Sequence, residues 1–493
     1  MNQARLKSIH LFVFLICSLI FSTGALAQMK LLPEDFLTKD FHAERRQKFR
    51  EKMPANSVAV FFANPIRNRA NDVDYTYHQD PDFFYLTGYR EPNAVLLIYK
   101  DKQQMNGATY DEIVFVQSKN ERAEQWTGRR LGPAGVAESL GIKMAFNGGE
   151  FKRYPVDFSK FSEVLFHDFE NDVRNEADSA DLYDLIVQFK SKAGYPEKNK
   201  LLIGAEKPAN NLNVKNLENL MKDLRGVKTA EELELIRMAV SISCAGQVEV
   251  MKAIKPGMSE REIQGIHEFV FKKYKAEDLG YPSIVGAGHN GCILHYTENY
   301  VPQIDNKDLI LMDLGAEYRG YTADITRTIP INGKFTNEQK IIYELVLEAQ
   351  EAAMAICKPG TPFPDLLKAT QKVIARGLKE QGIIKNDNEI RKYYPHGCCH
   401  HIGLDVHDRG NYEKLEENMT ITIEPGIYIP LNADVDPKWK GIAVRIEDDY
   451  LITKNGHEHL SKSAPRTVKE IEEMMTRPSA LDDFILPEIK KKK

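Results

Sequence analysis

Short apolar runs alternate with amphipathic stretches along the first half of the chain. Four runs have the composition of buried strands: Ser57–Phe62, Ala94–Tyr99, Glu112–Val116 and Leu201–Ile203. Two stretches have the apolar spacing of helices, Leu182–Phe189 and Leu212–Leu224. Strands that alternate with helices predict an α/β domain in this half.

Helix signals dominate after Gly226. Three capping boxes, each a Ser or Thr three residues before a Glu or Gln, lie at Thr229 and Glu232, Ser259 and Glu262, and Thr336 and Gln339. The first helix should run to about Ile254, where Lys255-Pro256-Gly257 stops it, and the third should stop at Lys358-Pro359-Gly360, with a fourth helix from Pro364. Each helix pair leads into a β-rich, glycine-rich stretch. The repeated order favours an internal duplication, with a pseudo-two-fold site between its halves, over a chance repeat of Lys-Pro-Gly.

This change of pattern predicts a domain of residues 28–225 and a second domain of residues 226–476. Residues 477–493 end in four lysines and are predicted to be a solvated tail. A chain of 493 residues with 42% hydrophobic residues is long and apolar enough for two or three domains. Its net charge of -5, without basic blocks, disfavours a nucleic-acid partner.

Residues 1–27 have the pattern of a secretory signal peptide. Arg5 and Lys7 precede the apolar run from Leu11 to Phe21, and Ala25-Leu26-Ala27 follows. The run is shorter than the roughly 20 residues that cross a bilayer, which favours cleavage near Ala27 over an uncleaved anchor. We therefore predict a secreted or periplasmic protein with no membrane contact after cleavage.

Five cysteines remain after residue 27: Cys244, Cys292, Cys357, Cys398 and Cys399. Their odd number and sparse spacing do not describe a disulfide framework. The adjacent pair could indicate redox or metal chemistry, but neighbouring cysteines are awkward as paired ligands. We interpret all five as small packing residues.

Four apolar runs of the second half carry a carboxylate where a buried strand is expected. Asp313 follows Leu309–Met312, Asp324 lies within Tyr321–Thr326, Glu424 follows Met419–Ile423, and Glu447 follows Ile442–Ile446. A buried carboxylate must be protonated, paired or bound to metal, because its charge otherwise costs several kcal/mol. Arg445 could pair with only one or two of them. Separate ion pairs would explain any one carboxylate, whereas four together favour a cluster that binds divalent cations.

Histidines concentrate in the segment from Pro395 to Asp408, PHGCCHHIGLDVHD. Two Asp, two Glu and one His carry a formal charge of -4, which balances two divalent ions. Oxygen ligands with one imidazole suit Mn²⁺, Co²⁺ or Zn²⁺. Spacing alone does not choose between His400 and His401. The chain has no Gly-x-Ser-x-Gly, Walker or His-Glu-x-x-His motif, so metal-assisted hydrolysis is the leading interpretation.

The ordered set of motifs resembles the pita-bread metallopeptidase family, and within it the Xaa-Pro aminopeptidases (aminopeptidase P). The resemblance covers nearly the whole chain after residue 27. It rests on Asn71-Asp72 with Tyr75 and Tyr77, Gln79–Pro92, Ile293–Tyr296, Met312–Gly315, Thr322–Arg327, His396–His407, Ile423–Gly426 and Arg445–Asp448. It implies a creatinase-like α/β amino-terminal domain and a pita-bread catalytic domain of duplicated α+β structure.

The resemblance also implies the site. Five residues would bind two divalent metal ions, Mn²⁺ first and Zn²⁺ or Co²⁺ as alternatives: Asp313, Asp324, His400, Glu424 and Glu447. The family's histidine four positions after His396 selects His400, and Asp324 and Glu447 would bridge the ions or nearly so. A metal-bridging hydroxide would attack the first peptide bond, and Glu424 would move its proton. His295 and His396 would position the substrate and stabilise the oxyanion, and His407 would contact the chain beyond the scissile bond.

The implied activity is hydrolysis of the amino-terminal Xaa-Pro bond of peptides. Two alternatives stay open: a prolidase, which cleaves only Xaa-Pro dipeptides, and a metal-free binding module of the same fold. Arg445 could orient a metal carboxylate or form a plain salt bridge. Asp72 lies in a loop whose family counterpart approaches a neighbouring subunit, which predicts a homo-oligomer.

Overall fold

The computed structural model describes residues 35–169, 172–175, 180–195 and 211–487. The predicted signal peptide and the predicted strand Leu201–Ile203 lie outside the described residues. All helices and strands below belong to one compact unit, Thr38–Lys493. Within the described ranges, every helix is too short or too polar to cross a bilayer.

The first half of the chain folds around a mixed sheet, which has six strands among the described residues, in the order β6-β5-β4-β1-β7-β8. The strands of this half are β1 (Ser57–Phe62), β2 (Asn68–Ala70), β3 (Val73–Asp74), β4 (Val95–Met105), β5 (Ala108–Val116), β6 (Ala145–Asn147), β7 (Glu163–Phe166) and β8 (Leu212–Asn213). Its helices are α2 (Lys39–Lys52), α3 (Pro81–Thr87), α4 (Glu121–Thr127), α5 (Gly132–Ser139), α6 (Leu182–Ala193) and α7 (Val214–Arg225). The central strand β1 is antiparallel to β4 and parallel to β7, and alternate residues such as Val58 and Val60 enter a buried core.

The described strands and helices that the pattern predicts in this half are present, with one correction. Leu212–Leu224 is predicted as one helix, but Leu212 and Asn213 pair with β7 as the short strand β8. The helix begins only at Val214, because the Asn213 side chain accepts a hydrogen bond from the Asn216 backbone N–H at 2.9 Å. An Asn that caps in this way ends the strand and starts the helix.

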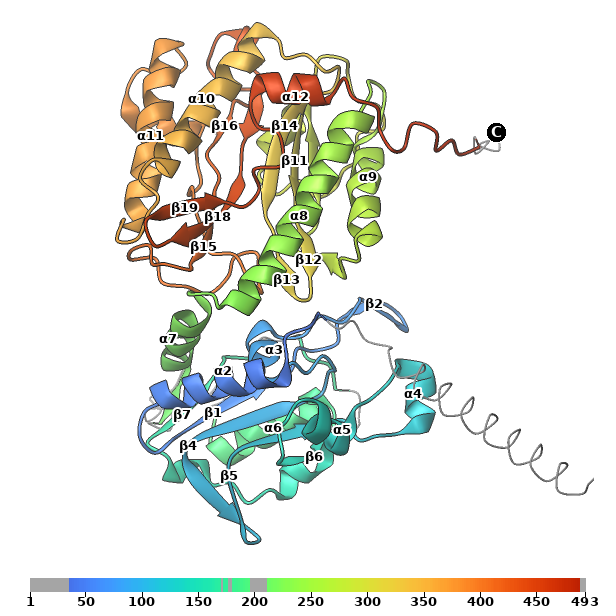
Figure 1. Cartoon of the computed structure of the whole chain (residues 1–493), viewed down its shortest axis with the longest axis vertical. Coiled ribbons are helices and arrows are strands. Elements are labelled where there is room, and N and C mark those ends of the chain that lie inside the picture. The colour runs from blue at the N-terminus through green and yellow to red at the C-terminus, as the bar shows by residue number, and fades with distance from the viewer. Residues whose placement is uncertain (1–34, 170–171, 176–179, 196–210, 488–493) are drawn as a thin grey trace, which may run out of the picture. The chain divides into compact units, whose positions relative to one another are not determined.

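The second half has two helix pairs around short sheets. Figure 1 shows α8 and α9 on one side of the strands and α10 and α11 on the other. The helices are α8 (Ala230–Ala253), α9 (Glu260–Lys273), α10 (Asn337–Met354), α11 (Phe363–Glu380) and α12 (Val468–Met474). The strands are β9 (Asp278–Leu279), β10 (Ile284–Ala287), β11 (Leu309–Leu314), β12 (Ala316–Tyr318), β13 (Tyr321–Thr322), β14 (Ile325–Pro330), β15 (Thr420–Ile423), β16 (Gly426–Tyr428), β17 (Ala443–Arg445), β18 (Asp448–Thr453) and β19 (Gly456–His459).

The three predicted capping boxes form and open α8, α9 and α10. The predicted single β run Tyr321–Thr326 is wrong, because it forms two strands in different sheets. A tight turn at Arg319 and Gly320, both with positive φ, returns β13 onto β12, whereas β14 pairs with β11 from Ile325 onward. Asp324 lies in the gap between β13 and β14.

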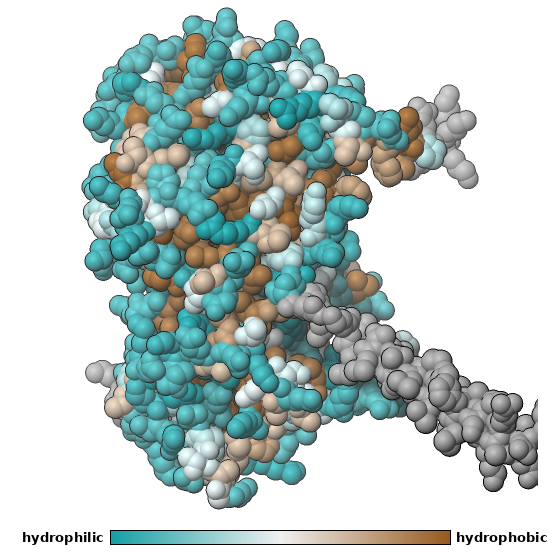
Figure 2. Space-filling view, viewed as in Figure 1, coloured by the Kyte–Doolittle hydropathy of each residue, from teal (hydrophilic) through white to brown (hydrophobic). Residues whose placement is uncertain are grey.

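The tail after Thr476 is less polar than predicted. Phe484, Ile485 and Leu486 are mostly exposed, and Figure 2 shows brown side chains along the described part of this tail. The segment before them is anchored: the Ser479 hydroxyl donates to Glu249 Oε1 at 2.6 Å.

Candidate metal centre and active site

One cavity of about 240 Å³ gathers the candidate residues of the second half. Among the described residues, its lining comprises Leu294, His295, Asp313, Asp324, His396, His400, His407, Glu424, Arg445 and Glu447. All five predicted ligands and all three predicted outer histidines are in this set. They come from segments up to 152 positions apart in the sequence, so the fold brings them together.

Antiparallel pairing places the carboxylates at neighbouring strand ends. Asp313 is the fifth residue of β11 and pairs across the sheet with Thr326 of β14. The Glu447 backbone N–H donates to the Thr326 carbonyl at 3.1 Å, and the Thr326 hydroxyl donates to Glu447 Oε2 at 2.7 Å. Thr326 therefore holds Glu447, which precedes β18, beside the end of β11.

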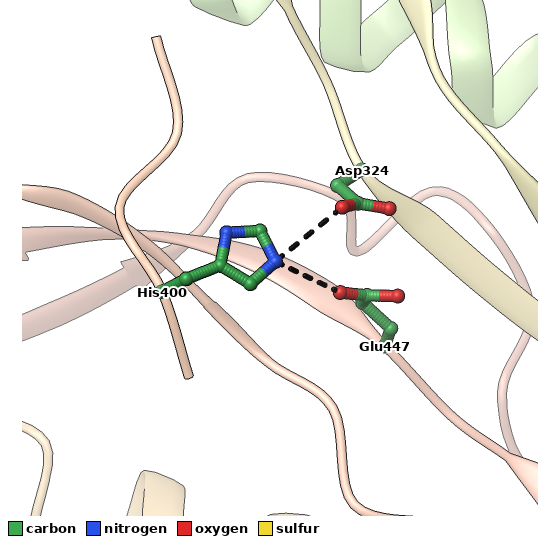
Figure 3. Close-up of side chains that lie close together, drawn as sticks. All are labelled: Asp324, His400 and Glu447. Carbon is green, nitrogen blue, oxygen red and sulfur yellow. Dashed lines mark ion pairs between the residues drawn. The ribbon is translucent and has the colours of Figure 1, made fainter. Parts of the chain in front are cut away.

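The segment that carries His400 runs along β15. The Thr422 N–H donates to the His400 carbonyl at 2.9 Å, and the Glu424 N–H donates to the Cys398 carbonyl at 2.8 Å. The His400 ring points at the carboxylates, with its Nε2 3.5 Å from Asp324 Oδ2 and 3.8 Å from Glu447 Oε1 (Figure 3). It also lies 3.8 Å from Glu424 Oε1. Donor atoms of Asp324, His400 and Glu447 all lie within 4.8 Å of one another, close enough for one cation to contact all three.

The acidic cluster has more negative charge than its protein partners neutralise. Burial and neighbouring carboxylates raise the pKa of Asp324 and of Glu447 well above the usual values, and burial raises that of Glu424 to about 7. Burial alone would raise the pKa of Asp313, but the Arg445 guanidinium holds it below its usual value. Arg445 Nη2 lies 2.6 Å from Asp313 Oδ2 and its Nε is 4.0 Å from Glu447 Oε2. Four carboxylates served by one arginine fit a site for divalent cations.

His396 is fixed in one neutral tautomer. Its Nδ1 lies 2.6 Å from the Gly397 carbonyl, which can only accept, so Nδ1 carries the proton. Its Nε2 then accepts from the Tyr428 hydroxyl at 2.8 Å, and that oxygen accepts from Arg445 Nη1 at 2.9 Å. Burial, and then Arg445, lower the pKa of His396 to about 4. The ring stays uncharged at neutral pH.

The other two outer histidines differ in their surroundings. His407 meets the His400 ring edge to face, with 4.5 Å between ring centroids, and burial lowers its pKa. His295 is exposed at the cavity, and its ring makes no hydrogen bond to the described part of the chain.

Several residues named in the sequence analysis lie away from the cavity lining. His401 is fully buried, its Nε2 is 3.0 Å from the Asn411 carbonyl, and its ring packs on Phe363 and Tyr412. Cys398 and Cys399 are free thiols with sulfur atoms 2.9 Å apart. Asp72 is exposed on the turn between β2 and β3.

Two residues that contact the candidate ligands, Tyr281 and Asp449, were not predicted from the sequence. The Tyr281 hydroxyl lies 2.5 Å from Asp313 Oδ1 and 2.6 Å from Asp324 Oδ1, so one hydroxyl group contacts both carboxyl groups. Asp449 Oδ2 accepts from the Asp324 backbone N–H at 3.1 Å. No local pattern marks Tyr281. Asp449 had a weak signal, because it is the second acid of Asp448-Asp449 at the head of an apolar run.

Comparisons with known proteins agree with this geometry. Residues 42–164 match the aminopeptidase P N-terminal domain, and residues 234–454 match metallopeptidase family M24. The Xaa-Pro aminopeptidase of Escherichia coli is 36% identical over 443 residues, covering 87% of this chain and 96% of its own. Human Xaa-Pro aminopeptidase 3 is 32% identical, covering 86% of this chain and 82% of its own.

Solved structures share the fold over most of the chain. The aminopeptidase of Pseudomonas aeruginosa superposes with a TM-score of 0.78 at 35% identity, covering 90% of this chain and 98% of its own. Escherichia coli aminopeptidase P with the inhibitor Pro-Leu superposes with a TM-score of 0.77 at 34% identity, covering 90% of this chain and 99% of its own. This confirms a two-domain pita-bread fold. The chain belongs to metallopeptidase family M24, as a member of its aminopeptidase P branch.

Proposed function

We propose that this chain is a dimetal aminopeptidase that hydrolyses the first peptide bond of peptides whose second residue is proline. The gathering of five ligand-type side chains and three outer histidines around one cavity carries the proposal. The relatives named Xaa-Pro aminopeptidase supply the substrate class. An inhibitor that begins with proline, Pro-Leu, fits an enzyme of this type, because cleavage of an Xaa-Pro bond leaves proline at the new amino terminus.

Asp313, Asp324, His400, Glu424 and Glu447 are the residues that would hold the cations. Divalent ions bound there would acidify a water molecule and polarise the scissile carbonyl. We propose Mn²⁺ as the native ion, with Zn²⁺ or Co²⁺ as alternatives, because the donors are mostly oxygen. Elemental analysis of the purified protein tests this choice.

The chain's own groups have separable tasks. Glu424 has one carboxylate oxygen 3.8 Å from His400 Nε2 and the other 3.6 Å from His396 Nδ1, so it can take a proton in the cavity and release it toward the leaving nitrogen. That nitrogen belongs to proline and has no hydrogen of its own. His295 and His396 would position the substrate and stabilise the oxyanion. For His396 this requires its Nδ1–H to leave the Gly397 carbonyl, because Nε2 accepts from the Tyr428 hydroxyl. His407 would contact the chain beyond the scissile bond.

Substrate length is the first test. We expect the protein to release only the first residue from a tripeptide such as Ala-Pro-Ala, and to leave Ala-Ala-Ala largely uncleaved. Reaction products separated by chromatography check this. Cleavage of Ala-Pro without cleavage of the tripeptide would establish a prolidase instead, an alternative that the relatives do not favour.

Glu424→Gln should retain the fold and the cavity but lower kcat by about a hundredfold to ten-thousandfold, the usual contribution of a general acid or base. The amide keeps the size of the side chain but cannot accept a proton at neutral pH. Steady-state kinetics with Ala-Pro-Ala measures the loss, and circular dichroism checks the fold. Wild-type kcat in this variant would remove Glu424 from proton transfer.

We also propose cleavage near Ala27, export to a secreted or periplasmic location, and domains of residues 28–225 and 226–476. The pattern of residues 1–27 and the change of pattern after Gly226 support these proposals. A homo-oligomer is proposed from the exposed turn at Asp72. Amino-terminal sequencing and light scattering of the purified protein test them.

A further inference from the structure

A buried glutamate lies at the start of α9, outside the cavity. Glu260 is the first residue of this helix and is fully buried. Its Oε1 accepts from the Ala287 N–H at 2.8 Å and from Asn290 Nδ2 at 3.2 Å. Its Oε2 accepts from the Tyr296 hydroxyl and from the Val301 N–H, both at 2.9 Å. These four donors are all neutral.

The four donors share one property: all belong to the segment from Ala287 to Val301. Ala287 ends β10, Asn290 lies in the short helical turn Gly288–Cys292, and Val301 is where the segment returns to α9. The Glu260 N–H also donates to the Val301 carbonyl at 3.1 Å. One carboxylate therefore contacts the beginning, the middle and the end of a segment that has little regular structure of its own.

His295 lies in this segment and lines the cavity. Its ring is exposed and makes no hydrogen bond within the described ranges, so its position depends on the backbone that carries it. The next residue, Tyr296, is buried in an apolar cluster with Ile284, Leu311 and Tyr428. Its hydroxyl donates to Glu260 and accepts from Asn290 Nδ2 at 3.0 Å. Because Tyr296 directly follows His295 in the chain, the burial and the hydrogen bonds of Tyr296 also fix the backbone that carries the His295 ring.

The negative charge of Glu260 is compatible with this burial. Four hydrogen bonds occupy its acceptor positions, and the N-terminus of a 14-residue helix favours a carboxylate in its first turn. The described contacts of this carboxylate therefore hold the segment by hydrogen bonds from neutral donors and not by an ion pair.

We infer that Glu260 is a positioning residue, which acts through the Tyr296 hydroxyl and the segment 287–301 to hold the His295 ring at the substrate. The inference rests on the proposed aminopeptidase function. It predicts that replacing Glu260 lowers kcat/KM only when His295 is present. A glutamate with a purely structural role would lower kcat/KM whether or not His295 is present.

A double-mutant cycle tests this. Glu260→Gln should lower kcat/KM for Ala-Pro-Ala by about tenfold to a hundredfold, since a misplacement of about 1 Å costs rates of this size. In the His295→Ala background the same change should lower kcat/KM by less than about twofold. Tyr296→Phe, which removes one donor and keeps the ring, is a second and milder probe. Equal losses in both backgrounds would overturn the inference.

Glu262→Gln is the matched control. Glu262 lies in the same turn of α9, where its Oε2 accepts from the Ser259 N–H at 2.7 Å, and glutamine can serve in the same capping box. It should leave kcat/KM unchanged.

Amide hydrogen exchange gives a readout that does not depend on activity. In Glu260→Gln and Tyr296→Phe, exchange within residues 288–301 should rise at least about tenfold, while exchange in α10 stays unchanged. Unchanged exchange in this segment would overturn the inference even for an inactive protein. A wild-type protein that does not cleave Ala-Pro-Ala would instead refute the proposed function, and exchange alone would then decide the role of Glu260.

Discussion

Replacing Asp324 by alanine is expected to remove bound metal and lower turnover by about a thousandfold or more. The carboxylate lies 3.5 Å from His400 Nε2 and shares the Tyr281 hydroxyl with Asp313, so it is central to the cluster. Ion chemistry at such a site supplies several kcal/mol of transition-state stabilisation, and each 1.36 kcal/mol is a tenfold change in rate. Elemental analysis and kinetics with Ala-Pro-Ala measure both effects.

The fold should survive this change. Loss of one of several mutually repelling carboxylates reduces the charge that the metal-free cavity must contain, so the thermal midpoint of the metal-free variant should equal or exceed that of metal-free wild type. Asp434→Ala, at an exposed aspartate outside the cavity, is the control and should change neither metal content nor rate. Full metal occupancy in Asp324→Ala would show that Asp324 is not a ligand.

Local patterns were enough to predict the starts of α8, α9, α10 and α11, the paired helices of the second half. Thr229 and Glu232 open α8 as a capping box, with Glu232 Oε2 accepting from the Thr229 N–H at 2.9 Å. These signals are short in sequence and depend little on the rest of the fold. The prediction of one strand over Tyr321–Thr326 was wrong for the opposite reason. The strand breaks at Asp324 because β13 pairs with β12 whereas β14 pairs with β11, and these partner strands cannot be identified from the six residues alone.

The candidate carboxylate ligands could be predicted from the sequence because each is a charged residue in or next to an apolar run. A carboxylate at the end of an apolar strand, as at Asp313 and Glu424, is conspicuous in any sequence. The supporting groups carry no such signal. Tyr281 and Glu260 occur in ordinary contexts, and their significance comes from contacts with residues tens of positions away. Metal binding by the five residues stays a prediction for Asp324→Ala to test.

A buried ion network whose residues do not line the cavity was not predicted from the sequence. Arg225, the last residue of α7, is 1% exposed. Its Nη1 donates to Asp82 Oδ1 at 2.6 Å and its Nη2 to Asp405 Oδ2 at 2.8 Å, and it also pairs with Asp408. Lys228 Nζ donates to Asp408 Oδ2 at 2.6 Å. The network joins α3, the end of α7 and the segment that carries His407.

Arg225→Met should lower the free energy of unfolding by at most about 3–5 kcal/mol at pH 7, because Asp82 and Asp408 would keep their buried charge and lose one cation each, with Arg409 still 2.9 Å from Asp82 and Lys228 still 2.6 Å from Asp408. Arg225 holds the pKa of both carboxyls below the usual value, so this stabilisation is present above the unfolded pKa of about 3.9 and is lost as pH falls. The difference between variant and wild type should therefore shrink toward pH 4, since the variant's carboxylates can take up protons.

Urea unfolding at pH 7 and near pH 4 measures this difference. Arg237→Met is the matched control. Arg237 pairs with Glu458, and the two side chains are 42% and 40% exposed, so the loss of this pair should lower the free energy of unfolding by less than about 1 kcal/mol. A similarly small cost for Arg225→Met would show that the network contributes little. A large cost would show that Arg225 stabilises the segment that carries His407. The cavity would then depend on charged residues that do not line it.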